Sequence, residues 1–154
     1  MSEGKKIITR NRKAAHDYHL DKRFEAGLVL TGSEIKSIRD HKVNLQDGFV
    51  QEQAGELWLM NVHITPYDRS GTYGYVDPVR PRKLLLNKRE IAEIITRVRQ
   101  KGFTVVPTEM YLKNGRAKVE IALAKGKRLY DKRQDIAKRD SEREIRQAMK
   151  ERYR

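Results

Sequence analysis

Alternating apolar and polar positions predict a β-hairpin in the first half of the chain. Residues 48–53 and 56–64 flank the turn Ala54-Gly55. In the second of these strands apolar side chains fall on both faces, as the neighbours Leu57 and Trp58 illustrate. A strand of this kind is typical of a position buried on both sides, as in a small barrel.

A second hairpin is predicted near the end of the patterned region. Residues 103–112 and 116–124 alternate on either side of Asn114-Gly115, and Asn-Gly between alternating strands is a strong hairpin signal. Because proline cannot donate a ladder hydrogen bond, Pro107 should place its strand at an edge or at a bulge.

Helical periodicity is clearest between the two hairpins. Ile91, Ile94, Ile95 and Val98 recur at helical spacing after a brief strand, Leu84-Leu85-Leu86. Asn87 and Glu90 form a capping box that starts this helix, and Gly102 suits its end. Residues 24–31 predict a first strand, Ile35 and Ile38 a short helix, and the Pro-rich residues 65–82 a long loop.

These elements predict a mainly β fold with some helix, organised around one domain. We expect a flexible basic arm over residues 1–17, which joins the fold near Tyr18. Residues 18–124 should form a small oligonucleotide-binding-type (OB-like) β-barrel with packed helices. From Lys125 the composition changes, since residues 125–154 hold twelve Lys/Arg against six Asp/Glu and few apolar residues. We expect this basic C-terminal tail to be disordered alone.

Charge points to a polyanionic partner. The 154 residues carry a net charge of +13, with 34 Lys+Arg against 21 Asp+Glu. RNA, DNA and an anionic membrane surface would all suit such a charge. A membrane anchor is disfavoured because the tail has neither a broad apolar face nor a lipidation motif. The start has no apolar segment of a secretory signal, so we expect a cytoplasmic protein.

Candidate chemistry is sparse. The chain has no cysteine, which excludes disulfides, thiolate metal sites and a cysteine nucleophile. His16 and His19 could share a helix face, but neither a metal-ligand set nor a ribonuclease acid–base pair completes them. We therefore expect no catalytic residue, no metal and no cofactor. A ribonuclease and a cold-shock or ribosomal barrel protein remain alternatives to an RNA-binding adaptor.

Tyr130 lies among cations at the start of the tail. A tyrosine so placed can stack on a base while its basic neighbours meet phosphates. The alternative is a solvated tail that only aids solubility. Residue patterns alone thus lead to a basic RNA-binding β-barrel with a basic tail.

Several longer motifs resemble the SsrA-binding protein family (small protein B). They are NRKAAHDY (11–18), FEAGL (24–28), GSEIKSIRDHKVNLQDGFV (32–50), KLLLN (83–87) and AKGKRLYDKR (124–133). The resemblance implies an OB-type barrel without catalytic activity that binds the tRNA-like domain of transfer-messenger RNA (tmRNA). It also implies delivery of that RNA, with elongation factor Tu, to stalled ribosomes for trans-translation. The tail would become helical in the message channel beside the small-subunit decoding centre, against ribosomal RNA.

The resemblance also implies which residues act. Those matched to tmRNA binding are Glu25, Leu85, Asn87, His16 and Tyr18. Those matched to the ribosome-binding tail are Gly126, Lys127, Arg128, Tyr130, Asp131, Lys132 and Arg133. Tyr130 stands where some members have His, which favours stacking as the shared property. Structural alternatives stay open: Asn87 as a helix cap, Leu85 as core, and Glu25 as a salt-bridge partner.

Overall fold

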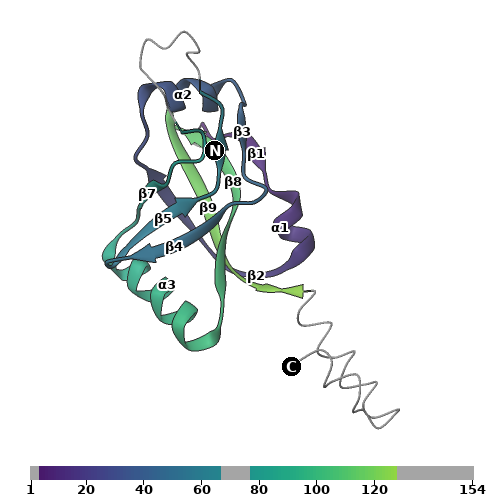
Figure 1. Cartoon of the computed structure of the whole chain (residues 1–154), viewed down its shortest axis with the longest axis vertical. Helices are drawn as coiled ribbons and strands as arrows, with labels where there is room; N and C mark the ends of the chain where they lie inside the picture. The colour runs from purple at the N-terminus through teal and green to yellow at the C-terminus, as the bar shows by residue number, and fades with distance from the viewer. Residues whose placement is uncertain (1–3, 67–76, 128–154) are drawn as a thin grey trace.

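A seven-stranded antiparallel sheet forms the body of the protein in the computed structural model, which describes residues 4–66 and 77–127 (Figure 1). Its strands, in spatial order, are β1 (Lys6–Arg10), β8 (Thr104–Lys113), β9 (Arg116–Gly126), β2 (Tyr18–Leu28), β7 (Arg82–Leu85), β5 (Glu56–Met60) and β4 (Phe49–Gln53). A separate short pair joins β3 (Val43–Asn44) to β6 (His63–Ile64). The β8–β9 hairpin therefore lies inside the sheet, between β1 and β2.

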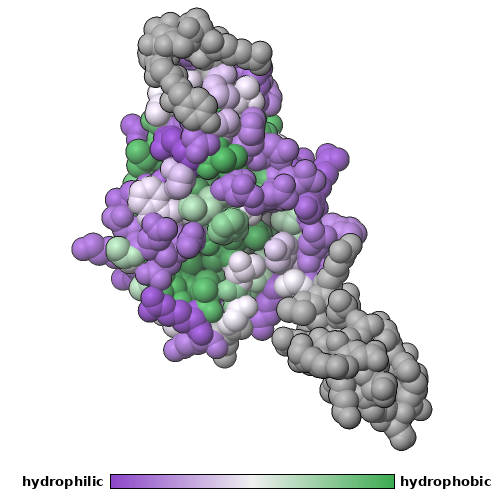
Figure 2. Space-filling model, in the orientation of Figure 1, coloured by the Kyte–Doolittle hydropathy of each residue, from purple (hydrophilic) through white to green (hydrophobic). Residues whose placement is uncertain are grey.

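The sheet curls into a small barrel around one main core. β4 returns to lie against β8, and the enclosed side chains include Phe24, Leu59 and Ile121. The helices are α1 (Arg12–Asp17), α2 (Gly32–Arg39) and α3 (Lys88–Lys101), which lie on different sides of the barrel (Figure 1). An apolar strip is visible between β4 and α3 in Figure 2, where Val50, Ile95 and Val98 are half-buried. The OB-like barrel with packed helices is confirmed.

The local signals for α3 and the second hairpin are confirmed. Asn87 caps α3 through a complete capping box with Glu90, and the helix ends at Gly102, whose φ is 72°. Asn114 and Gly115 both have positive φ, as a tight hairpin turn requires. Pro107 lies at a bulge, because the β8–β9 register shifts between Pro107 and Glu109.

The prediction of a flexible arm over residues 1–17 is wrong for the part that the structure describes. β1 pairs with β8, and α1 follows it directly. The Asn11 amide is buried, and it donates to the carbonyls of Leu45 (3.1 Å) and Pro107 (2.8 Å) while accepting from the Ala14 N–H (3.0 Å). Tertiary hydrogen bonds hold this segment in place, together with burial of Ile8 in the main core and of Ala14 against Val106 and Ala124.

Two strand predictions also need correction. β2 begins at Tyr18, six residues before the predicted start at Phe24, because pairing with β9 orders its charged first half. In β5 the apolar residues are not equally buried on both faces. Leu57 and Leu59 are buried, whereas Trp58 and Met60 are only half-buried.

A buried ionic cluster joins α2 to β7. The Glu34 carboxylate, 3% exposed, accepts from Arg82 Nε at 2.9 Å and from Arg80 Nη2 at 2.6 Å. Arg82 is fully buried and also donates to the Val62 carbonyl at 2.6 Å. Burial raises the pKa of Glu34, but hydrogen bonds from Arg80, the Thr31 N–H and Arg82 outweigh it, so the net pKa lies below its usual value. The cluster fixes residues 77–82, the described end of the predicted loop.

Candidate nucleic-acid interface

Leu85 is an exposed apolar residue at the centre of a concave surface that has charged side chains around it. It is 50% exposed, which rules out the alternative that it is simply core. Two hollows, of about 530 Å³ and about 310 Å³, meet at Leu85, Gly27 and Lys118. The antiparallel register explains the meeting, because Gly27 of β2 pairs with Leu85 on one side and Lys118 on the other.

Gly27 gives this surface its depth. A Cβ atom at this position would lie 3.4 Å from Leu85 Cβ and 3.7 Å from Lys118 Nζ. The absence of a side chain therefore leaves a depression between Leu85 and Lys118. The smaller hollow has an apolar lining from Leu28, Leu30, Ile35 and Ala117, with Arg39 and Arg116 among its polar residues. Apolar floors with cations nearby suit an unstacked base and its phosphate.

Glu25 lines the larger hollow and already has structural partners. Its Oε2 accepts from the Tyr111 hydroxyl at 2.6 Å and lies 3.5 Å from Lys113 Nζ. The Tyr111 hydrogen bond lowers the pKa of Glu25, and Lys113 and Lys118 lower it further against a smaller opposing effect of burial. Burial and the Glu25 carboxylate raise the pKa of Tyr111, so its hydroxyl stays protonated as the donor. Glu25 is nevertheless 38% exposed, so the salt bridge leaves it accessible to a ligand donor.

Asn87 lies in the same hollow and has a defined structural role. Its Oδ1 accepts from the Glu90 N–H at 2.9 Å, and Glu90 Oε1 accepts in return from the Asn87 N–H at 3.3 Å. The cap uses the side-chain oxygen, and the amide nitrogen retains donor capacity toward a ligand. The cap is thus confirmed, and a second role in binding is compatible with it.

Asn87→Ala should separate these two roles. Loss of the cap should lower the free energy of unfolding by about 1 kcal/mol. If the amide also meets RNA, affinity should fall further in protein that is still folded. Thermal melting and RNA affinity measured on one sample distinguish the cases. A lowered melting temperature with full affinity would leave only the cap.

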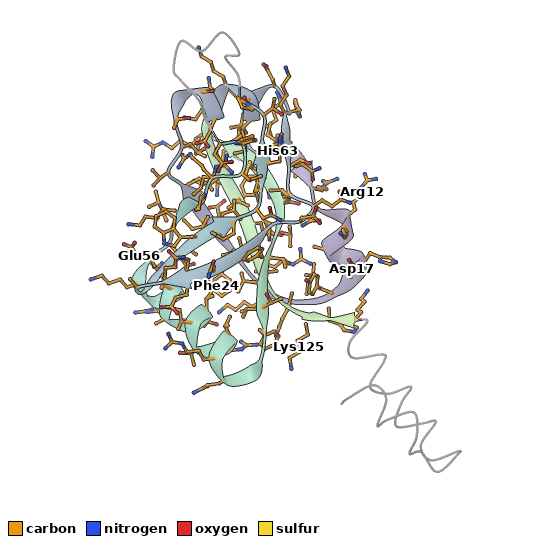
Figure 3. All side chains as sticks on the ribbon, viewed as in Figure 1. Arg12, Asp17, Phe24, Glu56, His63 and Lys125 are labelled. Carbon is orange, nitrogen blue, oxygen red and sulfur yellow. The ribbon has the colours of Figure 1, made fainter. Side chains whose placement is uncertain are left out.

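His16 and Tyr18 lie on the other flank of the barrel. Figure 3 places Asp17, between them in sequence, on the side opposite Glu56, which lines the larger Leu85 hollow. Tyr18 pairs with Gly126, and the Lys127 ammonium donates to the Ala15 carbonyl at 3.3 Å. The structure therefore groups Glu25, Leu85 and Asn87 together, and His16 and Tyr18 with the last described residues instead. Arg128, Tyr130, Asp131, Lys132 and Arg133 lie outside the described residues.

The sequence did not indicate Gly27, Lys118 or Tyr111 as site residues. Alternation in residues 116–124 places Lys118 on a polar face, which is the one available signal. Its neighbours follow from the β7–β2–β9 register, and that register is set by tertiary pairing.

Two features of residues 4–66 and 77–127 concern other classes of site. No group of three or more His, Asp or Glu there could hold a metal ion. No helix in this part of the chain is long and apolar enough to cross a membrane.

Comparisons with known proteins agree on one family. Residues 8–151 match the SmpB protein family. An SsrA-binding protein of Roseiflexus castenholzii is 56% identical over 149 residues, which cover 97% of this chain and 94% of the relative. One of Carboxydothermus hydrogenoformans is 52% identical and covers 96% and 99%, respectively. A solved structure described as "tmRNA-SmpB: a journey to the center of the bacterial ribosome" aligns with a TM-score of 0.65 and 46% identity, over 77% of this chain and 83% of its own.

Proposed function

The chain belongs to the SsrA-binding protein (SmpB) family, and on this premise we propose that it is an RNA-binding adaptor that binds the tRNA-like domain of tmRNA. It delivers this RNA to stalled ribosomes for trans-translation, so that incomplete proteins are tagged. The relative described with tmRNA and the bacterial ribosome supports both partners.

The observation that carries the proposal is the half-exposed Leu85 between two hollows, with Glu25 and Asn87 in the same larger hollow. A single exposed leucine is common on protein surfaces, but Leu85 lies where two hollows with basic side chains meet, and that combination suits an RNA-binding surface. Lys118 and Lys88 supply positive charge beside it, and Glu25 can accept from a base amine or a ribose hydroxyl. An unstacked RNA loop offers a base face to Leu85, phosphates to the two lysines, and amines and hydroxyls to Glu25.

The finer parts of the proposal concern the cycle around the RNA. The adaptor performs no catalytic step and needs no cofactor. It acts in the cytoplasm and reaches the ribosome together with elongation factor Tu through the shared RNA. Residues 128–154 enter the empty message channel past the decoding centre, where their cations gain ribosomal RNA phosphates as counter-charges.

Leu85→Glu tests the proposed surface. The new carboxylate removes an apolar contact and repels phosphate, so tmRNA affinity should fall by about tenfold or more, as for a central contact residue. Val79→Glu is the matched control, because Val79 is 39% exposed and lines neither of the two hollows at Leu85. Circular dichroism should show that both variants are folded.

Titration of the unaltered protein with tmRNA at several salt concentrations measures the electrostatic contribution to affinity. Each phosphate contact should add roughly 0.7–0.9 to the slope of log affinity against log salt. Gel analysis of the recovered RNA should show intact strands, whereas cleavage would favour a ribonuclease. Equal losses in the two variants, or a flat salt response, would contradict the proposed surface.

A further inference from the structure

The β2–β9 ladder continues beyond the barrel, to the point where the tail begins. β8 stops pairing with β9 at Ala124, opposite Thr104. β2 continues to pair with β9, through His19 opposite Lys125 and Tyr18 opposite Gly126. Figure 1 shows this end of β9 leaving the barrel beside β2. Lys125 and Gly126, the first two residues of the predicted tail 125–154, are therefore held by β2 and are not disordered as expected.

A bulge sets the direction of this extension. The register shifts between Leu20 and Arg23, so Asp21 and Lys22 lie outside the regular pairing. Both are tied to α3: Asp21 Oδ2 lies 2.8 Å from Arg97 Nη2, and Lys22 Nζ lies 2.8 Å from Glu93 Oε2. Bulges bend a strand and increase its twist. The two ion pairs therefore fix the bend at which β2 turns away from the barrel.

The side chains of Lys125 and Lys127, where the chain leaves the barrel, contact two different parts of the fold. Lys125 Nζ lies 4.8 Å from the centre of the Phe103 ring, which follows α3. Lys127 Nζ donates to the Ala15 carbonyl near the C-terminus of α1. A cation at a helix C-terminus is favourable because the carbonyls there carry partial negative charge. These contacts, one with the residue that follows α3 by two positions and one with α1, orient Lys125 and Lys127.

We propose that these contacts form a tail anchor that sets the direction in which residues 128–154 leave the barrel. The tail anchor comprises Tyr18–Leu20, the bulge residues Asp21 and Lys22, Phe103 and Ala124–Lys127. It rests on the proposed function, because direction matters only if the tail must reach a fixed target. Tyr18 is then a positioning residue, because it caps the C-terminus of α1 and starts the anchoring ladder, and His16 lies in the last turn of α1 beside it. Neither residue acts by contact with the RNA at Leu85.

The anchor has a mechanical reason. A small change of angle where residues 128–154 leave the barrel moves the far end of this segment by a large distance. A segment whose starting direction is fixed also loses less conformational freedom on binding. Weakening the contacts of the tail anchor should therefore slow binding to the ribosome without weakening RNA binding at the Leu85 surface.

Glu93→Lys tests the anchor without altering the tail. It replaces the ion pair with Lys22 by repulsion, and Lys22→Glu/Glu93→Lys restores the pair in reversed order. Glu52→Lys is the matched control: Glu52 pairs with Arg99 of the same helix at 2.9 Å, and its side chain is 30% exposed against 33% for Glu93. Three quantities are measured: tmRNA affinity, amide hydrogen exchange at residues 18–20 and 124–126, and tag addition on stalled ribosomes.

In Glu93→Lys, exchange at the ladder should speed up and tagging should fall by about two- to fivefold, the range of one exposed ion pair. Its tmRNA affinity should match that of Glu52→Lys, and the reversed pair should restore both exchange and tagging. Unchanged exchange, unchanged tagging despite faster exchange, or failure of the reversed pair would overturn the anchor. A loss of tmRNA affinity equal to the loss of tagging would also overturn the anchor, because it would place the Lys22–Glu93 pair on the RNA-binding surface. Failure of the unaltered protein to bind tmRNA would refute the proposed function itself.

Discussion

Glu34→Ala should lower the free energy of unfolding by about 3–5 kcal/mol, because it leaves the fully buried Arg82 without its counter-charge. Arg80 loses its partner as well, and the Thr31 N–H loses its cap. Since single domains have only about 5–15 kcal/mol of stability, much of the population could unfold. Urea unfolding followed by circular dichroism measures the change.

Glu56→Ala is the control for this loss. Glu56 pairs with Lys83 at 2.9 Å, but the two side chains are 46% and 37% exposed. An exposed pair contributes only about 0–1 kcal/mol. Similar losses of unfolding free energy in Glu34→Ala and Glu56→Ala would show that burial does not make the Glu34 ion pairs more important than an exposed pair.

The pH dependence of stability follows from the same cluster. The pKa of Glu34 is lower in the folded state than in the unfolded chain, where it is about 4.3. Its contribution is therefore present above about pH 4.3 and disappears as pH falls through the folded-state pKa. Glu34→Gln should show a weaker dependence on pH in this acidic range than the unaltered protein. Parallel curves for the two proteins would contradict this assignment.

A chain that ends at Lys127 should lose tag addition completely while keeping tmRNA binding. Among the described residues every strand ends by Gly126, so the truncation leaves the sheet, the Leu85 surface and the Ala15–Lys127 contact intact. The proposed channel contacts, by contrast, all lie in the deleted residues. Tagging in a translation system stalled on truncated message measures the effect, with tmRNA affinity measured in parallel.

The truncated chain should unfold in urea at the same midpoint as the full chain, which serves as the control. A peptide of residues 125–154 should show little helix in buffer, because like-charge pairs oppose its short capping box and apolar stripe. Full tagging by the truncated chain, or strong helix in the isolated peptide, would contradict the proposed role of the tail.

Short-range chemistry accounts for what the sequence could predict. The Asn87 cap, Gly102 and the Asn114-Gly115 turn each involve residues a few positions apart, so the pattern of residues was sufficient. The motif residues Glu25, Leu85 and Asn87 were indicated by resemblance, and the fold brings them together. Their contacts with RNA remain a prediction.

Long-range pairing accounts for what the sequence could not predict. β1 is short, and it is ordered by pairing with β8, about one hundred positions away, and by burial of Ile8 in the main core. The buried ion pairs of Glu34 were not predicted, because its partners Arg80 and Arg82 lie at the far end of the predicted loop 65–82. The placement of Tyr18 beside Gly126 likewise depends on the β2–β9 register. The resemblance had grouped His16 and Tyr18 with the residues around Leu85, and the fold places them elsewhere.

The strand order has a consequence for how this protein folds during its own synthesis. β1 and β2 emerge first, but both pair with the β8–β9 hairpin, whose strands are the last to be made among those of residues 4–66 and 77–127. At ordinary synthesis rates the roughly one hundred residues between β2 and the end of β9 take about 5–20 s. During that interval the early strands have unpaired edges, which invite aggregation. A nascent chain halted before Thr104 contains neither partner strand, so it cannot close the barrel.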